Sequence, residues 1–143
     1  PLRLIQLVDN IIREQRKVLI FFPDIAMMKS LATVMKTKYR RLESVYSGDA
    51  ERYEKVQMMR DGELDILLTT TILERGVTFL YLDVIVVDAH RFDSASLIQI
   101  CGRVGRKPTD PTGNIWLLTT FNTAGIRQTI TAIKEFNKGR AVL

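Results

Sequence analysis

Apolar residues along the chain follow two alternating patterns, helical spacing and short unbroken runs. Residues 4–12 carry leucine, valine and isoleucine three or four positions apart, which predicts an amphipathic helix that ends near residues 13–17. Residues 18–22 are a continuous apolar run before a proline, which predicts a strand buried on both faces, as in a parallel sheet. Asp24 is then placed to cap a second helix, whose methionines face the core.

The same alternation continues toward the end of the chain. Gly62 is expected to close a helix of residues 50–61. The remaining elements are expected as strands at residues 42–46, 65–69, 84–87 and 115–118, an arginine-bearing helix after residue 87, and a helix at 124–138. This order predicts an α/β domain of three layers with a mainly parallel sheet and right-handed crossovers. The functional residues are expected in the loops at the carboxyl ends of the strands.

Length and composition are those of one soluble globular domain. The chain has 143 residues, of which 46% are hydrophobic and 26% charged, and its apolar runs are too short to span a bilayer. We therefore expect residues 1–143 to form a single domain. The first residue is Pro1 rather than methionine and no targeting segment is visible, so the domain is expected to be a fragment of a longer chain.

Charge and cysteine content narrow the possible partners only a little. The net charge of +5 favours polyanions through counterion release. The basic cluster of residues 36–41 is nevertheless interpreted mainly as a solvated face. The single cysteine, Cys101, excludes an internal disulfide or a thiolate zinc cluster and fits a reducing cytoplasm.

The segment from Gln99 to Arg106 is the richest in chemistry. In a helix, Gln99, Arg103 and Arg106 occupy positions i, i+4 and i+7 and project from one stripe. Two planar guanidinium groups on one face suit the oxygens of a triphosphate. The alternative is a helix end with basic residues in its last turn. That alternative leaves Gln99 and the two glycines of the segment unexplained, so the phosphate interpretation is favoured.

A second candidate segment, residues 69–77, directly follows a predicted strand. Thr71 and Glu74 form a capping box for a short helix that ends at Gly76. A helix start flanked by hydroxyl groups is also a phosphate site, because its free amide groups point outward. Both interpretations hold together, since a capped terminus can still bind a phosphodiester.

Several common sites are missing from the sequence. It has no Gly-x-x-x-x-Gly-Lys-Ser/Thr loop and no acidic strand-end motif for magnesium, so the chain is not expected to hold and hydrolyse ATP alone. It also has no Gly-x-Gly-x-x-Gly loop for a dinucleotide. His90 is the only histidine and no nucleophile elbow is present, which argues against a Ser-His-Asp hydrolase.

These segments together resemble the motifs of superfamily 2 helicases. Residues 99–106 resemble motif VI, residues 69–77 motif V, residues 18–23 motif IV, and residues 46–49 the segment after it. The resemblance implies the second, C-terminal RecA-like lobe of a nucleic-acid motor, a P-loop NTPase-like fold that lacks the P-loop itself. Gln99 and Thr78 depart from the histidine and aspartate usual in DEAD-box proteins. The sequence of these motifs is similar to that of ComFA-type late-competence proteins of Gram-positive bacteria. Those proteins are ATPases that drive transforming DNA into the cell.

The resemblance also implies roles for individual residues. Arg103 and Arg106 are expected to reach the γ-phosphate of ATP as arginine fingers, with Gln99 assisting. The positions expected at the nucleotide are Arg75, Gly76 and Thr78. The positions expected at the DNA backbone are Ser47, Gly48, Thr69, Thr70 and Thr71. ATP and Mg²⁺ are expected to bind mainly to the N-terminal lobe, and this chain is expected to hold no metal of its own.

The implied partners are single-stranded DNA and the N-terminal RecA-like lobe of the same chain. A cytoplasmic location is expected, with the DNA-uptake machinery at the inner face of the membrane as a further partner and no membrane insertion. Two alternatives stay open within nucleic-acid biology: a lobe of a replication-restart or recombination DNA helicase, and a non-catalytic nucleic-acid-binding module. An unrelated doubly wound domain is the third.

Overall fold

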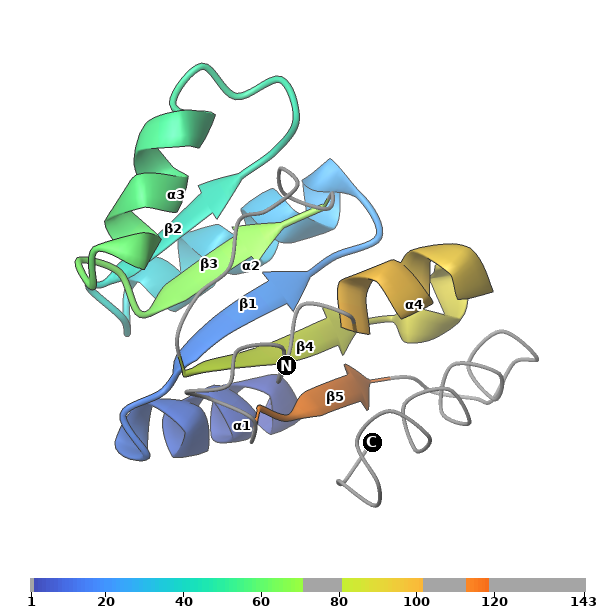
Figure 1. The fold of residues 1–143 in the computed structure, drawn as a ribbon, viewed down its shortest axis with the longest axis horizontal. Coiled ribbons are helices and arrows are strands. Elements are labelled where there is room, and N and C mark those ends of the chain that lie inside the picture. Colours follow the sequence, from blue (N-terminus) through green and yellow to red (C-terminus); the bar gives the residue numbers. More distant parts are fainter. Residues whose placement is uncertain (1, 71–80, 102–112, 119–143) are drawn as a thin grey trace.

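The strands of the domain form one parallel sheet. The structure is a computed structural model that describes residues 2–70, 81–101 and 113–118. Within these ranges the sheet has five strands in the order β2-β3-β1-β4-β5 (Figure 1). The strands are β1 (Lys17–Phe21), β2 (Leu42–Val45), β3 (Ile66–Thr69), β4 (Leu82–Val87) and β5 (Ile115–Leu118). Each neighbouring pair is parallel, which confirms the sheet expected from the sequence.

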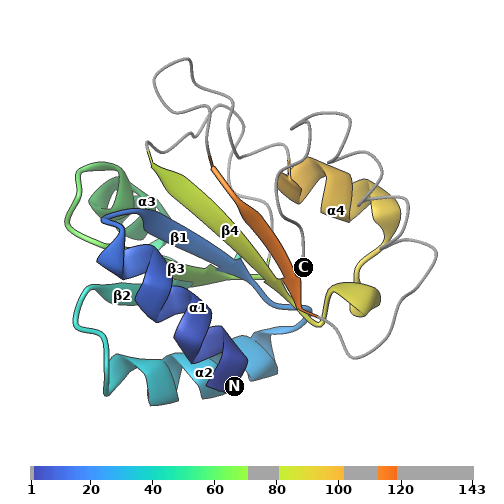
Figure 2. The same cartoon turned by 90° about the horizontal axis from the view of Figure 1, so that it is seen from below.

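Helices cover both faces of this sheet. They are α1 (Leu2–Arg13), α2 (Ile25–Lys36), α3 (Arg52–Arg60), a short 3₁₀ helix η1 (Ala89–Arg91) and α4 (Ser94–Cys101). Figure 2 shows α1 and α2 on one side of the sheet and α4 on the other. The expected three-layer α/β architecture is therefore confirmed. Of the helices in the described ranges, none has the length and apolarity needed to cross a membrane.

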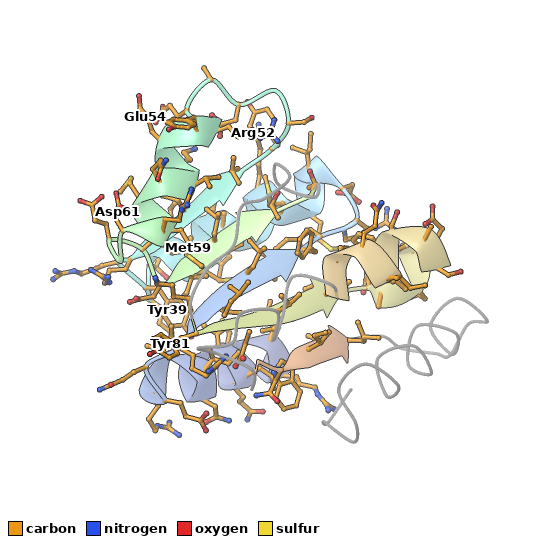
Figure 3. The ribbon with its side chains drawn as sticks, in the orientation of Figure 1. Tyr39, Arg52, Glu54, Met59, Asp61 and Tyr81 are labelled. Carbon is orange, nitrogen blue, oxygen red and sulfur yellow. The ribbon has the colours of Figure 1, made fainter. Side chains whose placement is uncertain are left out.

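Two apolar clusters hold the layers together, and β1 contributes to both. Val18 and Ile20 pack into the cluster that includes α1 and α2. Leu19 and Phe21 pack into the cluster under α3 and α4, where Met59 points from α3 toward the sheet (Figure 3). Successive strand residues point to opposite faces, so a strand covered on both sides is apolar at every position. The apolar run of residues 18–22 has this origin.

Strand β4 begins two residues earlier than the sequence predicts, at Leu82 rather than at residue 84. The prediction missed this start because Asp83, the second residue of the strand, is charged. In the structure Asp83 is only 2% exposed. Its Oδ1 accepts hydrogen bonds at 2.9 Å from Arg16 Nε and from the backbone amide of Asn114. A buried carboxylate needs such partners. They come from segments far away in the sequence, so the pattern around Asp83 gave no sign of them.

Helix α3 begins later than predicted, at Arg52 rather than at residue 50. The preceding residues form a turn in which Asp49 Oδ1 accepts a hydrogen bond from the Glu51 amide at 2.8 Å. An aspartate bonded to the backbone two residues on favours a turn over a helix. The predicted end is confirmed, since Gly62 follows the helix with φ of +82°. The predicted helix at 124–138 lies outside the described residues.

The basic cluster of residues 36–41 lies near the amino ends of the strands. Most of its side chains are paired with carboxylates: Lys36 with Glu43 at 3.3 Å, Lys38 with Asp9 at 2.8 Å and Arg41 with Asp65 at 2.8 Å. These basic side chains are also exposed. The prediction of a solvated face is confirmed, and three of the basic side chains in the cluster are neutralised locally by carboxylates.

Candidate functional site

The carboxyl ends of β1, β2 and β3 bring two of the predicted segments together. Phe21 and Val45 are both in register with Thr69, the last residue of β3. Parallel strands that end in register leave their following residues at the same edge of the sheet. The turn of residues 46–49 after β2 and Thr70 after β3 therefore emerge next to each other. This edge is the candidate site.

The two threonines at this edge differ in exposure. The side chain of Thr69 is fully buried, and its carbonyl accepts a hydrogen bond from the Phe22 amide at 2.8 Å. Thr70 is partly exposed. In this structure Thr69 belongs to the sheet, and Thr70 is the threonine with a surface that a ligand can reach.

The predicted residues Ser47 and Gly48 form an exposed turn that is held from below by an ion pair. Lys55 Nζ of α3 lies 2.8 Å from Asp49 Oδ2 and donates to the Ser44 carbonyl, also at 2.8 Å. The hydrogen bond from Lys55 is the main reason that the pKa of Asp49 lies below its ordinary value. Both charged side chains are at least four-fifths buried, so the turn is firmly attached to β2 and α3.

A second ion pair joins the ends of β1 and β4. β4 is followed by Asp88 in the left-handed conformation, φ 51°, which turns the chain into η1. Arg91 at the end of η1 then places its Nη2 2.9 Å from Asp24 Oδ2. The other oxygen of Asp24 accepts a hydrogen bond from the Met27 amide at 2.7 Å, which confirms the predicted cap of α2. Chiefly this amide, and then Arg91, hold the pKa of Asp24 below its ordinary value.

Gln99, the first residue of the motif VI-like segment, lies in the last turn of α4. Its side chain is exposed, whereas Leu97 and Ile100 pack into the core. The start of α4 is capped by Asp93, whose Oδ1 accepts a hydrogen bond from the Ser96 amide at 2.7 Å. This amide lowers the pKa of Asp93. The helix is anchored by its buried side chains and its capped start, and it exposes the Gln99 side chain to solvent.

The remaining predicted positions lie outside the described residues. They are Thr71, Arg75, Gly76, Thr78, Arg103 and Arg106. Within the described ranges no group of histidine, cysteine, aspartate and glutamate side chains could hold a metal ion.

Several basic residues near this edge were not selected from the sequence. Lys55 and Arg91 make the ion pairs above, and Arg52 at the start of α3 has a buried Nε with no hydrogen-bond partner in the described part of the chain (Figure 3). Arg91 and Asp24 lie far apart in the sequence, so no regular spacing of residues could have indicated that they form a pair. Lys55 and Asp49 are six residues apart across a turn, which also matches no helical or strand period.

The sequence of this chain also matches a known protein family. Residues 3–108 match the family described as helicase conserved C-terminal domain. The chain belongs to this family. It is 43% identical over 144 residues to the competence protein ComFA of Streptococcus pneumoniae, covering 95% of this chain and 33% of that protein. For ComFA of Bacillus subtilis the identity is 36% over 129 residues, covering 89% and 28%. The domain thus spans about a third of the length of these relatives.

Solved structures show the same fold. The Mss116p DEAD-box helicase domain 2 bound to an RNA duplex superposes with a TM-score of 0.73 at 18% identity, over 92% of this chain and 54% of that one. RecG bound to a three-way DNA junction gives a TM-score of 0.69 at 18% identity, over 94% of this chain and 18% of that one. The helicase domain is therefore of the RecA-like type expected from its motifs, and the expected similarity to ComFA proteins is confirmed.

Proposed function

We propose that this helicase C-terminal domain is the second motor lobe of an ATP-dependent, single-strand DNA translocase. The observation that carries the proposal is Gln99, exposed on α4 and followed in the sequence by Arg103 and Arg106 at helical spacing. The spacing of these three residues in the sequence is that of one stripe of a helix. The 43% identity to a competence protein supports a role in the uptake of transforming DNA.

In this proposal the arginines act on a nucleotide that another lobe holds. The sequence lacks a P-loop and an acidic magnesium motif, so ATP and Mg²⁺ bind mainly to the N-terminal lobe. Arg103 and Arg106 neutralise the charge that develops on the transferred phosphoryl group, and Gln99 assists nearby. Arg75, Gly76 and Thr78 are assigned in this proposal to contacts with the same nucleotide.

The DNA strand runs along the carboxyl edge of the sheet. The Ser47–Gly48 turn and Thr70 offer hydroxyl and amide donors at neighbouring positions, and Thr69 and Thr71 flank Thr70. Donors of this kind hold a phosphate backbone without reading its sequence. Closing of the two lobes on ATP and their release after hydrolysis then move the strand stepwise.

The proposal is tested in the full-length protein, including its N-terminal lobe. We expect Arg103→Ala and Arg106→Ala each to lower the DNA-stimulated kcat of ATP hydrolysis on the order of a thousandfold or more, with little change in ATP affinity. Arg60→Ala is the matched control, since Arg60 is exposed in the last turn of α3, at the opposite edge. Unchanged turnover in both finger variants would contradict the assignment.

A lobe of a DNA repair or recombination enzyme is the second candidate. It is favoured by 32% identity over 129 residues to the transcription-repair-coupling factor of Staphylococcus haemolyticus, over 70% of this chain and 10% of that protein. The two candidate functions can be distinguished by the phenotype of cells that carry the Arg103→Ala allele. Loss of transformation with normal survival of DNA damage supports DNA uptake, and the reverse phenotype supports repair.

A further inference from the structure

One exposed lysine of α2 lies beside the turn after β2. Lys29 Nζ is 5.0 Å from the centre of the Tyr46 ring, which is within the range of a cation–π contact. The same ring lies close to the turn, because a Cβ added at Gly48 would be 3.6 Å from Tyr46 Cε2. Tyr46 thus holds the Lys29 ammonium group next to the Ser47–Gly48 turn.

The charge of Lys29 is not neutralised by a bonded carboxylate. Among the described residues it forms no ion pair, in contrast to Lys36, Lys38 and Lys55. The charge of Lys29 makes a small contribution to the lowered pKa of Asp49. However, both oxygens of Asp49 already accept hydrogen bonds, one from the Glu51 amide and one from Lys55. The Lys29 ammonium group therefore keeps its donors for a ligand.

The turn next to it also has unused donors. The Ser47 hydroxyl and the Gly48 amide take part in no hydrogen bond within the part of the chain that the structure describes, and both residues are exposed. One cation beside two neutral donors matches a group with a single negative charge and several acceptor oxygens. A phosphodiester has these properties.

We infer that Lys29 is a phosphate contact of this domain and binds the same phosphodiester as the Ser47–Gly48 turn. The inference rests on the proposed function, because it takes the bound strand to be single-stranded DNA. The Asp49–Lys55 pair fixes the turn, and the Tyr46 ring restricts the lysine, so the donors are arranged before the strand arrives. Such arrangement lowers the entropy cost of binding. The contact is electrostatic and independent of base sequence.

The test measures binding of fluorescein-labelled oligonucleotides, one of thymidine only and one of mixed sequence, to the full-length protein over a range of potassium chloride concentrations. We expect Lys29→Gln to weaken both complexes on the order of fivefold at about 0.1 M salt, and to reduce the slope of log K against log salt by about 0.7. Lys29→Arg should bind as the wild type does. Lys36→Gln, in the last turn of the same helix, is the matched control and should also bind normally.

Two outcomes overturn the inference alone. The first is a Lys29→Gln protein that binds both oligonucleotides with wild-type affinity and salt dependence. The second is an equal loss in Lys36→Gln, which would assign the effect to net charge rather than to this position. If the wild-type protein binds neither oligonucleotide, the proposed function fails and the inference fails with it. Thermal unfolding of each variant, followed by circular dichroism, checks that the fold is intact.

Discussion

Gly48 and Gly62, both in turns, differ in backbone conformation. Gly62 ends α3 with φ of +82°, its amide donating to the Met59 carbonyl at 3.3 Å and the next amide donating to Met58 at 2.8 Å. This pair of hydrogen bonds is a Schellman motif, which requires the left-handed conformation. Gly48 has no positive φ, and a Cβ there would make only ordinary contact with Tyr46. Of these two glycines, Gly62 is therefore the one whose backbone conformation favours glycine.

The substitution Gly62→Ala should destabilise the domain. A side chain in the left-handed region costs about 1–2 kcal/mol, and no neighbouring atom lies within 4 Å of the added Cβ to change that figure. Gly48→Ala is the control and should leave the free energy of unfolding unchanged, or raise it by up to about 1 kcal/mol. Urea unfolding of the two variants measures both effects. Equal stability of the two would show that the end of α3 tolerates another conformation.

At the scale of the elements, the turn between β2 and α3 depends on Lys55. Replacing Lys55 with Gln removes its bonds to Asp49 and to the Ser44 carbonyl, and we expect a loss of about 1–3 kcal/mol in the free energy of unfolding near neutral pH. The pKa of Asp49 is lowered in the folded protein, so its contribution is present above the ordinary value of 3.8 and disappears as pH falls through the folded value.

The difference between wild type and Lys55→Gln should therefore shrink in acid. Urea midpoints of both proteins, measured from about pH 7 down to about pH 2.5, give this difference directly. Lys55→Arg keeps the charge and should restore part of the stability. A difference that stays constant across this range would mean that Lys55 acts through packing and not through the ionised Asp49.

The positions of the elements could be predicted well because covered strands are apolar at every residue. The prediction for β5, residues 115–118, matches the structure fully. The bounds of β1, β2 and β3 differ from the predictions by one residue. The starts of β4 and α3 differ by two, where a polar side chain finds a partner far away in sequence, as Asp83 does, or bonds its own backbone, as Asp49 does. Local patterns hold no information about such partners.

For the candidate site, the sequence located the loops better than the side chains. The predicted Ser47–Gly48 turn and Thr70 do lie at the carboxyl edge, because parallel strands end there together. Lys29 and Arg91 reach the same edge only through the strand order β2-β3-β1-β4-β5, which a one-dimensional pattern does not specify.

At the scale of the whole molecule, the ion pairs of the described residues lie at both edges of the sheet. Basic side chains near the amino ends of the strands are mostly paired with carboxylates, and Arg16 with Asp83 forms a buried pair there. At the carboxyl edge, Lys55 and Arg91 are paired with Asp49 and Asp24, whereas Lys29 is exposed and forms no ion pair among the described residues. Lys29 therefore places an exposed positive charge at the edge that we propose binds DNA.

The same pairing makes the stability of the whole domain sensitive to acid. The pKa values of Asp9, Asp24, Asp49 and Asp93 all lie below their ordinary value, each chiefly because its carboxylate accepts a hydrogen bond. The unfolded chain then binds more protons than the folded one as pH falls toward and below 3.8, so stability must fall in that range. Urea midpoints should decline below about pH 5 and change little between about pH 6 and 8. A midpoint independent of pH down to about pH 3 would show that these carboxylates are equally stabilised in the unfolded chain.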